Sequence, residues 1–171
     1  MGKESTAMSL DLDQIFQDVR KMLGGKNTIK DTMGLSDNSM EYLYGTAFDF
    51  YEAGKYEKST SIFKLLCYYN NHELKYFKAL GSSLQMQGKY LDAITAYSFA
   101  TIMDHKDPEP PLHAAHCYMK LGDLEKARTG FLCASTYAEE SEKPDSIKNY
   151  AAKMVDLVDG MKKPDKKSKG L

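Results

Sequence analysis

Three short strings recur along this chain of 171 residues at one fixed interval: GKYEKS at 54–59, GKYLDA at 88–93 and GDLEKA at 122–127. Each string starts 34 residues after the previous one, on Gly54, Gly88 and Gly122. A repeat of this length predicts a chain built from copies of one small unit. Such units bury their apolar faces against one another, so the repeat constrains the fold more than any other feature of the sequence.

The repetition extends well beyond the three strings. Seven residues before each glycine the chain has a small residue, four before it a large one, and nine after it an aromatic ring. The small residues are Ala47, Gly81 and Ala115, the large ones Phe50, Leu84 and Tyr118, and the rings Phe63, Tyr97 and Phe131. Spacings of three, four and seven are helical, so each unit is predicted to be a helix, a tight turn at the glycine and a second helix. The small residues let the two helices approach closely, and the large residues fill the space between them.

This pattern resembles the tetratricopeptide repeat. The expected fold is all-α, with three tandem helix–turn–helix repeats in a right-handed superhelix between N-terminal and C-terminal flanking helices. The repeat helices are predicted near 38–53, 56–70, 74–87, 90–104, 110–121 and 124–138, and a capping helix with one apolar side near 145–160. The chain departs from the family pattern in having no Trp, and in placing Pro111 at the first large position of the third unit.

The sequence divides into four parts. Residues 1–9 and the basic tail 161–171 are predicted to be disordered, residues 10–35 to form an N-terminal helix and linker, and residues 36–160 to form the repeat domain with its cap. The helix near 10–23 carries an apolar stripe and stops at Gly24-Gly25, before a short helical turn near 29–34. A lone amphipathic helix must bury that stripe somewhere. We predict that the free protein pairs with a second copy in a homodimer through Leu12, Ile15, Phe16 and Val19. The alternative is that the helix folds back on its own first repeat.

Charge and cysteine usage exclude several classes of protein. The formal net charge is −1, and the last ten residues hold five Lys and one Asp, so the rest of the chain is mildly acidic. A nucleic-acid-binding protein would instead present a basic patch or stripe. The three cysteines are odd in number and none is paired at C-x-x-C spacing, which is typical of buried thiols in a reducing cytoplasm. No run of 18 apolar residues occurs, so direct membrane insertion is not expected.

The first helix of each repeat should line a concave groove. The residues predicted to face that groove lie one turn round from the core positions: Tyr44, Phe48 and Tyr51, then Lys78, Ser82 and Gln85, then Leu112, His113 and His116. Three aromatic residues at i, i+4 and i+7 make an anchoring strip for an extended peptide. We expect this strip to point away from the column of Ala47 and Phe50 that packs against Phe63. The alternative is that these aromatic residues are ordinary packing between repeats.

An enzyme is the less favoured hypothesis. The string HAAHC places His113, His116 and Cys117 within one helical turn, but zinc needs three or four ligands, and Cys117 is expected to face the core. No acidic residue is spaced as a general base with the histidines, and the chain has no phosphate-binding glycine loop and no nucleophile motif. No catalytic residue, metal or cofactor is therefore predicted.

Three stretches carry a resemblance to a known family: LYGTAFDFYEAGKYEKSTSIFKLLC, SFATIMDHKDPEPPLHAAHC and the preceding GGKNTIKDTMGLS. They resemble the class II chaperones of bacterial type III secretion, the SycD/LcrH group, over about residues 26–160. The resemblance implies a protein of the bacterial cytoplasm that binds hydrophobic translocator proteins and uses its N-terminal helix for dimerisation. It also implies that the groove takes a Pro-x-Leu-x-x-Pro-like segment, with Tyr44, Phe48, Tyr51 and His113 at the matching positions. The alternative is a general tetratricopeptide adaptor or regulatory scaffold without a link to secretion.

Overall fold

The computed structural model describes residues 28–141 and 145–162, and in these ranges the chain forms eight helices and no strand. The helices are α2 (Ile29–Thr32), α3 (Asp37–Glu52), α4 (Tyr56–Tyr69), α5 (Leu74–Met86), α6 (Tyr90–Met103), α7 (Glu109–Lys120), α8 (Leu124–Glu140) and α9 (Asp145–Lys162). The predicted repeat and capping helices are confirmed, with bounds within about two residues of those expected. The predictions for residues 1–9, for the helix near 10–23 and for most of the basic tail lie outside the described residues.

The three repeat glycines end the first helix of each repeat. Gly54, Gly88 and Gly122 have φ angles of 71°, 72° and 77°, in the left-handed region that glycine adopts without a steric penalty. After Gly54, the N–H of Lys55 donates to the carbonyl of Phe50 at 2.8 Å, and the N–H of Gly54 donates to that of Tyr51 at 2.9 Å. This pair of bonds is the Schellman motif, which satisfies the last carbonyls of α3 and turns the chain into α4. Equivalent bonds follow Gly88 and Gly122.

The columns of small and aromatic residues form the core of the stack. Ala47 and Ala115 are fully buried, and the rings of Phe63, Tyr97 and Phe131 are at most 1% exposed. A Cβ added to Gly81 would lie 2.6 Å from the ring of Tyr97, so the absence of a side chain at this position is what lets α5 and α6 approach. Phe50 differs from the expectation: it is half-buried, with Lys58 Nζ lying 5.6 Å from its ring centroid.

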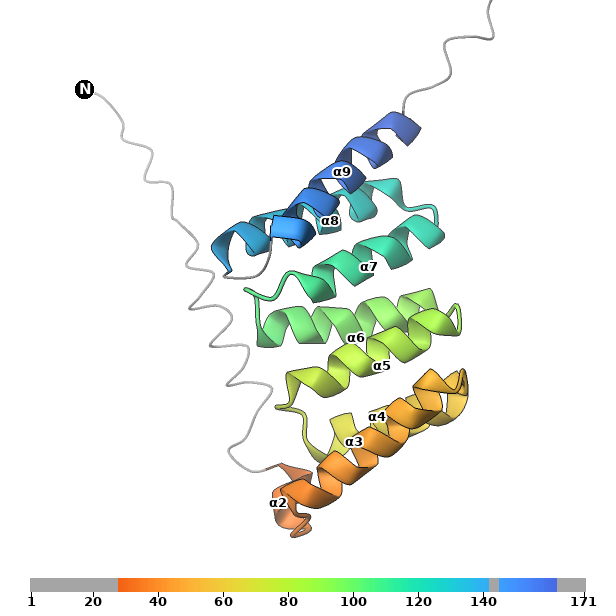
Figure 1. The fold of residues 1–171 in the computed structure, drawn as a ribbon, viewed down its shortest axis with the longest axis vertical. Helices are drawn as coiled ribbons and strands as arrows, with labels where there is room; N and C mark the ends of the chain where they lie inside the picture. The colour runs from red at the N-terminus through yellow and green to blue at the C-terminus, as the bar shows by residue number, and fades with distance from the viewer. Residues whose placement is uncertain (1–27, 142–144, 163–171) are drawn as a thin grey trace, which may run out of the picture.

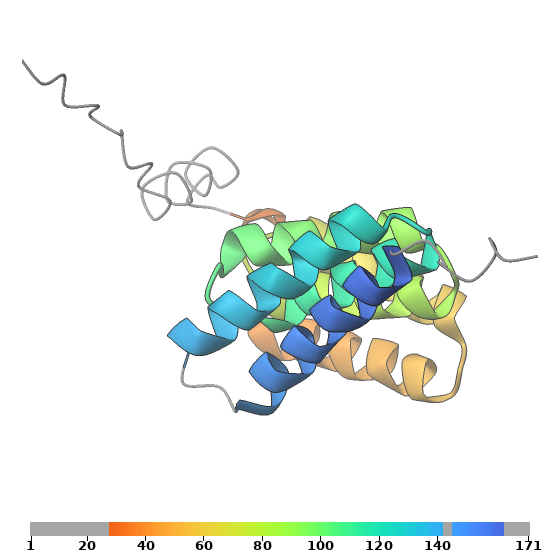
Figure 2. The ribbon, with the colours of Figure 1, turned by 90° about the horizontal axis from the view of Figure 1, so that it is seen from above.

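The helices stack in chain order, from α2 at one end to α9 at the other (Figure 1). The short α2 packs against α4, each helix from α3 onward packs against the next, and α9 packs against α8 and closes the last repeat (Figure 2). The buried residues of α9, Ala151, Val155 and Val158, join the core of the third repeat. Pro110 and Pro111 sit in the first turn of α7, where an N–H would have no partner within the helix. Pro111 therefore departs from the repeat pattern without disturbing the helix.

Candidate functional site

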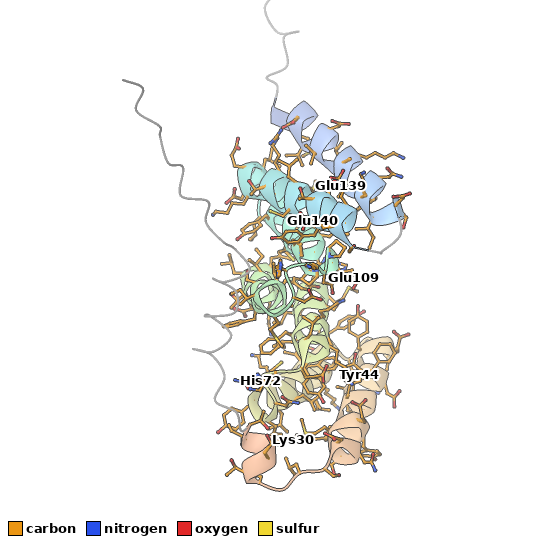
Figure 3. The ribbon with its side chains drawn as sticks, turned by 90° about the vertical axis from the view of Figure 1, so that its left-hand side faces the viewer. Lys30, Tyr44, His72, Glu109, Glu139 and Glu140 are labelled. Carbon is orange, nitrogen blue, oxygen red and sulfur yellow. The ribbon has the colours of Figure 1, made fainter. Side chains whose placement is uncertain are left out.

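A pocket of about 490 Å³ opens between the first helices of the three repeats, α3, α5 and α7. We call it the groove pocket. Its two sides differ in chemistry, because α3 and α4 supply rings whereas α5, α7 and the residues before them supply charged and polar groups. The aromatic side is made of Tyr44, Phe48, Tyr51 and Phe63, and the polar side of Glu73, Lys75, Lys78, Ser82, Glu109 and His113. Tyr44 and Glu109 lie toward one side of the stack and His72 toward the other (Figure 3).

The aromatic side is a set of rings that hold one another in place. Phe48 stacks on Tyr51 with ring centroids 6.3 Å apart, and Tyr51 meets Tyr56 edge-on at 5.4 Å. Phe48 is nevertheless 47% exposed, which is high for a phenylalanine in a helix centre. The rings are thus arranged before any ligand arrives, and Phe48 still has a free face to offer an apolar side chain.

Tyr44 has a double role that the sequence did not predict. Its ring lies 5.6 Å from Phe63 and 5.8 Å from Tyr76, both of which are buried, and Lys75 Nζ lies 5.1 Å from its centroid. The expectation that the whole strip points away from Phe63 is therefore wrong for Tyr44. This residue lines the groove pocket and also packs against the core.

Tyr97 forms part of the floor. Its ring stacks on His113 at 5.4 Å, and its hydroxyl donates a hydrogen bond to Gln85 Oε1 at 2.9 Å. Burial raises the pKa of Tyr97 well above its ordinary value, so the phenol stays neutral. Burial likewise lowers the pKa of His113, so its imidazole is neutral at pH 7 and presents an aromatic face. The floor is thus uncharged.

The two lysines on the polar side pair with carboxylates. Lys78 Nζ donates to Asp107 Oδ2 at 2.8 Å and also to Glu109, while Lys75 pairs with Glu41 of α3. Burial alone would lower the pKa of Lys78, but its hydrogen bonds to Asp107 and Glu109 outweigh burial and hold the pKa above its ordinary value. Because both lysines are paired with carboxylates, this side of the pocket offers hydrogen bonds to a peptide backbone rather than a cation for an acidic ligand.

Six of the nine residues predicted to face the groove line the groove pocket: Tyr44, Phe48, Tyr51, Lys78, Ser82 and His113. Gln85 lies behind the floor and holds the hydroxyl of Tyr97. Leu112 is only 9% exposed and belongs to the buried cluster of the third repeat, which α9 completes. Its prediction as a groove residue is corrected for that reason. The candidate dimer residues Leu12, Ile15, Phe16 and Val19 precede Thr28, lie outside the described residues and stay a prediction.

His116 lies beyond the groove pocket, between α7, α8 and α9. It meets the ring of Phe131 edge-on at 5.0 Å, and its Nε2 lies 3.2 Å from the hydroxyl of Tyr150. Within residues 28–141 and 145–162, no group of three or more His, Cys, Asp or Glu side chains could hold a metal ion. Burial raises the pKa of Cys67 to about 12 and that of Cys117 to about 11, so neither is a thiolate at neutral pH.

Sequence reasoning missed two parts of the site. Phe63 and Tyr97 were assigned only to the core, yet both also line the groove pocket. The signal was present, because an aromatic ring nine residues after each repeat glycine is long enough to cross between the helices and reach the concave side. The ion pairs of Lys75 and Lys78 join residues that lie far apart in the sequence, so no local sequence pattern predicts them.

Comparison with protein families identifies the repeat. The sequence model of the family described as tetratricopeptide repeat matches residues 40–71 and 74–107, which contain the first two repeats. The third repeat, α7 and α8, is seen in the structure and in the 34-residue period. In the part of the chain that the structure describes, no helix is long and apolar enough to cross a membrane.

Curated proteins and solved structures give specific relatives. The low calcium response locus protein H of Yersinia pestis is 33% identical over 145 residues, which are 84% of each chain. PcrH of Pseudomonas aeruginosa, in complex with the chaperone binding region of PopD, matches with a TM-score of 0.73 and 35% identity over 76% of this chain and 98% of PcrH. The type III secretion chaperone SycD of Yersinia enterocolitica, in complex with a peptide of the translocator YopD, matches with a TM-score of 0.69 and 32% identity over 75% of this chain and 98% of SycD.

Proposed function

The chain belongs to the family of type III secretion translocator chaperones, and on that premise we propose that its groove pocket holds an extended segment of a translocator protein. The observation that carries the proposal is the aromatic side of the pocket, where Phe48 keeps almost half of its surface exposed beside the stacked ring of Tyr51. When a ligand covers such an exposed hydrophobic surface, the burial of that surface stabilises the complex. Each Pro or Leu side chain buried there contributes roughly 1.5–3 kcal/mol.

An extended, proline-bearing ligand suits both sides of the pocket. Such a segment loses little conformational entropy on binding, because proline already restricts the free chain. Its alternate side chains can face the rings while its carbonyls face the lysines and the Ser82 hydroxyl. This arrangement explains why one pocket carries aromatic groups on one side and locally neutralised polar groups on the other.

The role that follows is to keep a membrane-active partner soluble until it is exported. A translocator must later enter a membrane, so its apolar segments would aggregate or insert early if they were left uncovered. We place the protein in the bacterial cytoplasm and assign it no catalytic activity, since holding a partner needs no bond to be made or broken.

The test is co-expression of the full chain with a candidate translocator that carries long apolar stretches. The chaperone should keep the translocator in the soluble fraction and co-purify with it. Ala79 lines the groove pocket, and Ala79→Phe fills it without removing any ring. This variant should lose the translocator, whereas Ala152→Phe, at an exposed position on α9 outside the pocket, should retain it. Equal retention by both folded variants would show that the groove pocket is not the binding site.

A further inference from the structure

The polar side of the groove pocket holds more carboxylates than ammonium groups. Among the described residues that line this side or pair with its lysines, two carry an ammonium group and four carry a carboxylate. The ammonium groups belong to Lys75 and Lys78, and the carboxylates to Glu41, Glu73, Asp107 and Glu109. Burial lowers the pKa of the neighbouring His113, so this side chain adds no positive charge at pH 7. Together these residues give the polar side an excess of two negative charges.

The ammonium group of Lys78 is shared between two carboxylates of unequal burial. It lies 2.8 Å from Asp107 Oδ2, whose side chain is 4% exposed, and it also pairs with Glu109, whose side chain is 38% exposed. A buried carboxylate depends more on its cation than an exposed one does, because water does not solvate it. Glu109 therefore lines the pocket with a carboxylate that water or a ligand can reach, and whose charge Lys78 only partly offsets.

The ammonium group of Lys75 is shared in the same way at the start of α5. Its hydrogen bond to Glu41 raises the pKa of Lys75 most, and the negative charge of Glu73 raises it further. The same Nζ lies 5.1 Å from the ring centroid of Tyr44, so a cation already rests against a ring of the aromatic side. The faces of aromatic rings attract cations, as carboxylates do. Both sides of the pocket thus favour a positively charged group over a negatively charged one.

This inference rests on the proposed function and adds to it the charge of the ligand. We propose that the translocator segment carries a lysine or arginine among its apolar anchors, and that Glu109 and Glu73 select it. The alkyl part of such a side chain packs along the rings while its charged end meets the carboxylates. An aspartate or glutamate at the same place would meet like charges. Complementary charge of this kind contributes to the choice between ligands more than to overall affinity.

Calorimetric titration of the full chain with a set of synthetic peptides tests the charge preference. All peptides share one Pro-x-Leu-x-x-Pro frame, and Lys, Gln or Glu is placed in turn at each of the three x positions. At one or more positions, Lys should bind about threefold tighter than Gln at low ionic strength, and Glu about threefold weaker. Added salt should reduce the difference, because it screens charges on a partly exposed surface.

Two variants remove a carboxylate from the pocket. Glu109→Gln retains an oxygen that can accept from Lys78 but removes the charge, and Glu73→Gln does the same beside Lys75. Each should reduce the ratio of the Lys-peptide affinity to the Glu-peptide affinity by about threefold. Glu139→Gln is the matched control, because Glu139 near the end of α8 pairs with Lys148 of α9 outside the pocket (Figure 3). It removes the same charge and should keep the ratio.

Several results would overturn the inference. Equal binding of Lys, Gln and Glu at every position shows that the pocket does not select charge, and leaves the proposed function standing. Tighter binding of the Glu peptides shows that the two lysines dominate instead. A ratio that Glu139→Gln reduces as much as Glu109→Gln assigns the effect to the charge of the whole chain. If none of the peptides binds, the proposed function fails, and this inference fails with it.

Discussion

Lys78 of α5 reaches across to the next repeat and donates to Asp107 Oδ2 at 2.8 Å. The Asp107 side chain is only 4% exposed, and its other oxygen accepts a hydrogen bond from the backbone N–H of Glu109 at the start of α7. One ammonium group thus neutralises a buried carboxylate that also fixes where α7 begins. Through this contact the polar side of the groove pocket depends on how the second and third repeats are joined.

Lys78→Met should therefore destabilise the fold, because it removes the ammonium group that pairs with the buried Asp107 carboxylate. Lys78 is itself partly exposed, so the expected loss of unfolding free energy is about 1–3 kcal/mol, below the cost of breaking a fully buried pair. Chemical denaturation measures it. Lys75→Met is the control: its pair with Glu41 is exposed on both sides and should cost under about 1 kcal/mol. Adding Asp107→Asn to Lys78→Met should recover part of the loss, and equal losses at Lys78 and Lys75 would contradict this account.

Gly81→Ala should destabilise the protein, because the new methyl group would lie 2.6 Å from the Tyr97 ring and force α5 and α6 apart. The expected cost is roughly 1–3 kcal/mol, the usual range for overpacking a core. Gly45→Ala on α3 is the matched control, since its methyl group would meet nothing within 4 Å. That change should stabilise α3 by up to about 1 kcal/mol through helix propensity. Thermal melts of the two variants should move in opposite directions.

Stability should fall as the solution is acidified below the ordinary histidine pKa of 6.5. Burial is the main cause that lowers the pKa of both His113 and His116 in the folded protein. Around His113, Glu109 and Asp107 act to raise the pKa and Lys78 to lower it; around His116, His113 and Lys120 both lower it. The unfolded chain therefore binds protons first as the pH falls, so stability is full above pH 6.5 and is lost as the pH drops toward the lowered pKa values.

Denaturation at a series of pH values tests this dependence. His113→Gln should flatten the profile over the window below pH 6.5, because it removes one of the two groups that titrate differently in the folded and unfolded states. A wild-type profile that is level across this window would contradict the burial of the two histidines.

Tyr44→Ala should lower both stability and affinity, because Tyr44 packs on Phe63 and also lines the groove pocket. The loss of a partly buried ring against the core is expected to cost about 2–3 kcal/mol of unfolding free energy, less than the 3–5 kcal/mol of a fully buried one. Thermal denaturation and a peptide titration, made on the same sample, separate the two effects. An unchanged melting temperature would show that Tyr44 does not support the core and only faces the groove, as the sequence predicted.

The 34-residue repeat predicts the features that recur in every repeat unit and misses those that occur in one unit alone. A 34-residue repeat locates helices, turns and the close approach at Gly81, because these depend on residues within one repeat unit. It assigns Leu112 to the groove by analogy with Tyr44 and Lys78, and fails there because Leu112 is apolar and joins the buried cluster of the third repeat. The ion pair between Lys78 and Asp107 joins residues 29 positions apart, and Asp107 lies in the loop before α7. The repeat pattern does not predict where side chains lie in that loop.

The central claim is that the aromatic side of the groove pocket binds an extended, proline-bearing peptide. Calorimetric titration of a synthetic peptide with one Pro-x-Leu-x-x-Pro segment into the full chain and into Phe48→Ala tests it most directly. Phe48→Ala should weaken binding by about 2 kcal/mol, some thirtyfold, while the melting temperature changes little, because Phe48 is 47% exposed. Tyr42→Ala, on the same helix, 77% exposed and outside the pocket, should bind like the unmodified chain. If Phe48→Ala binds as tightly as Tyr42→Ala while it lowers the melting temperature, Phe48 is a packing residue and the groove assignment is contradicted.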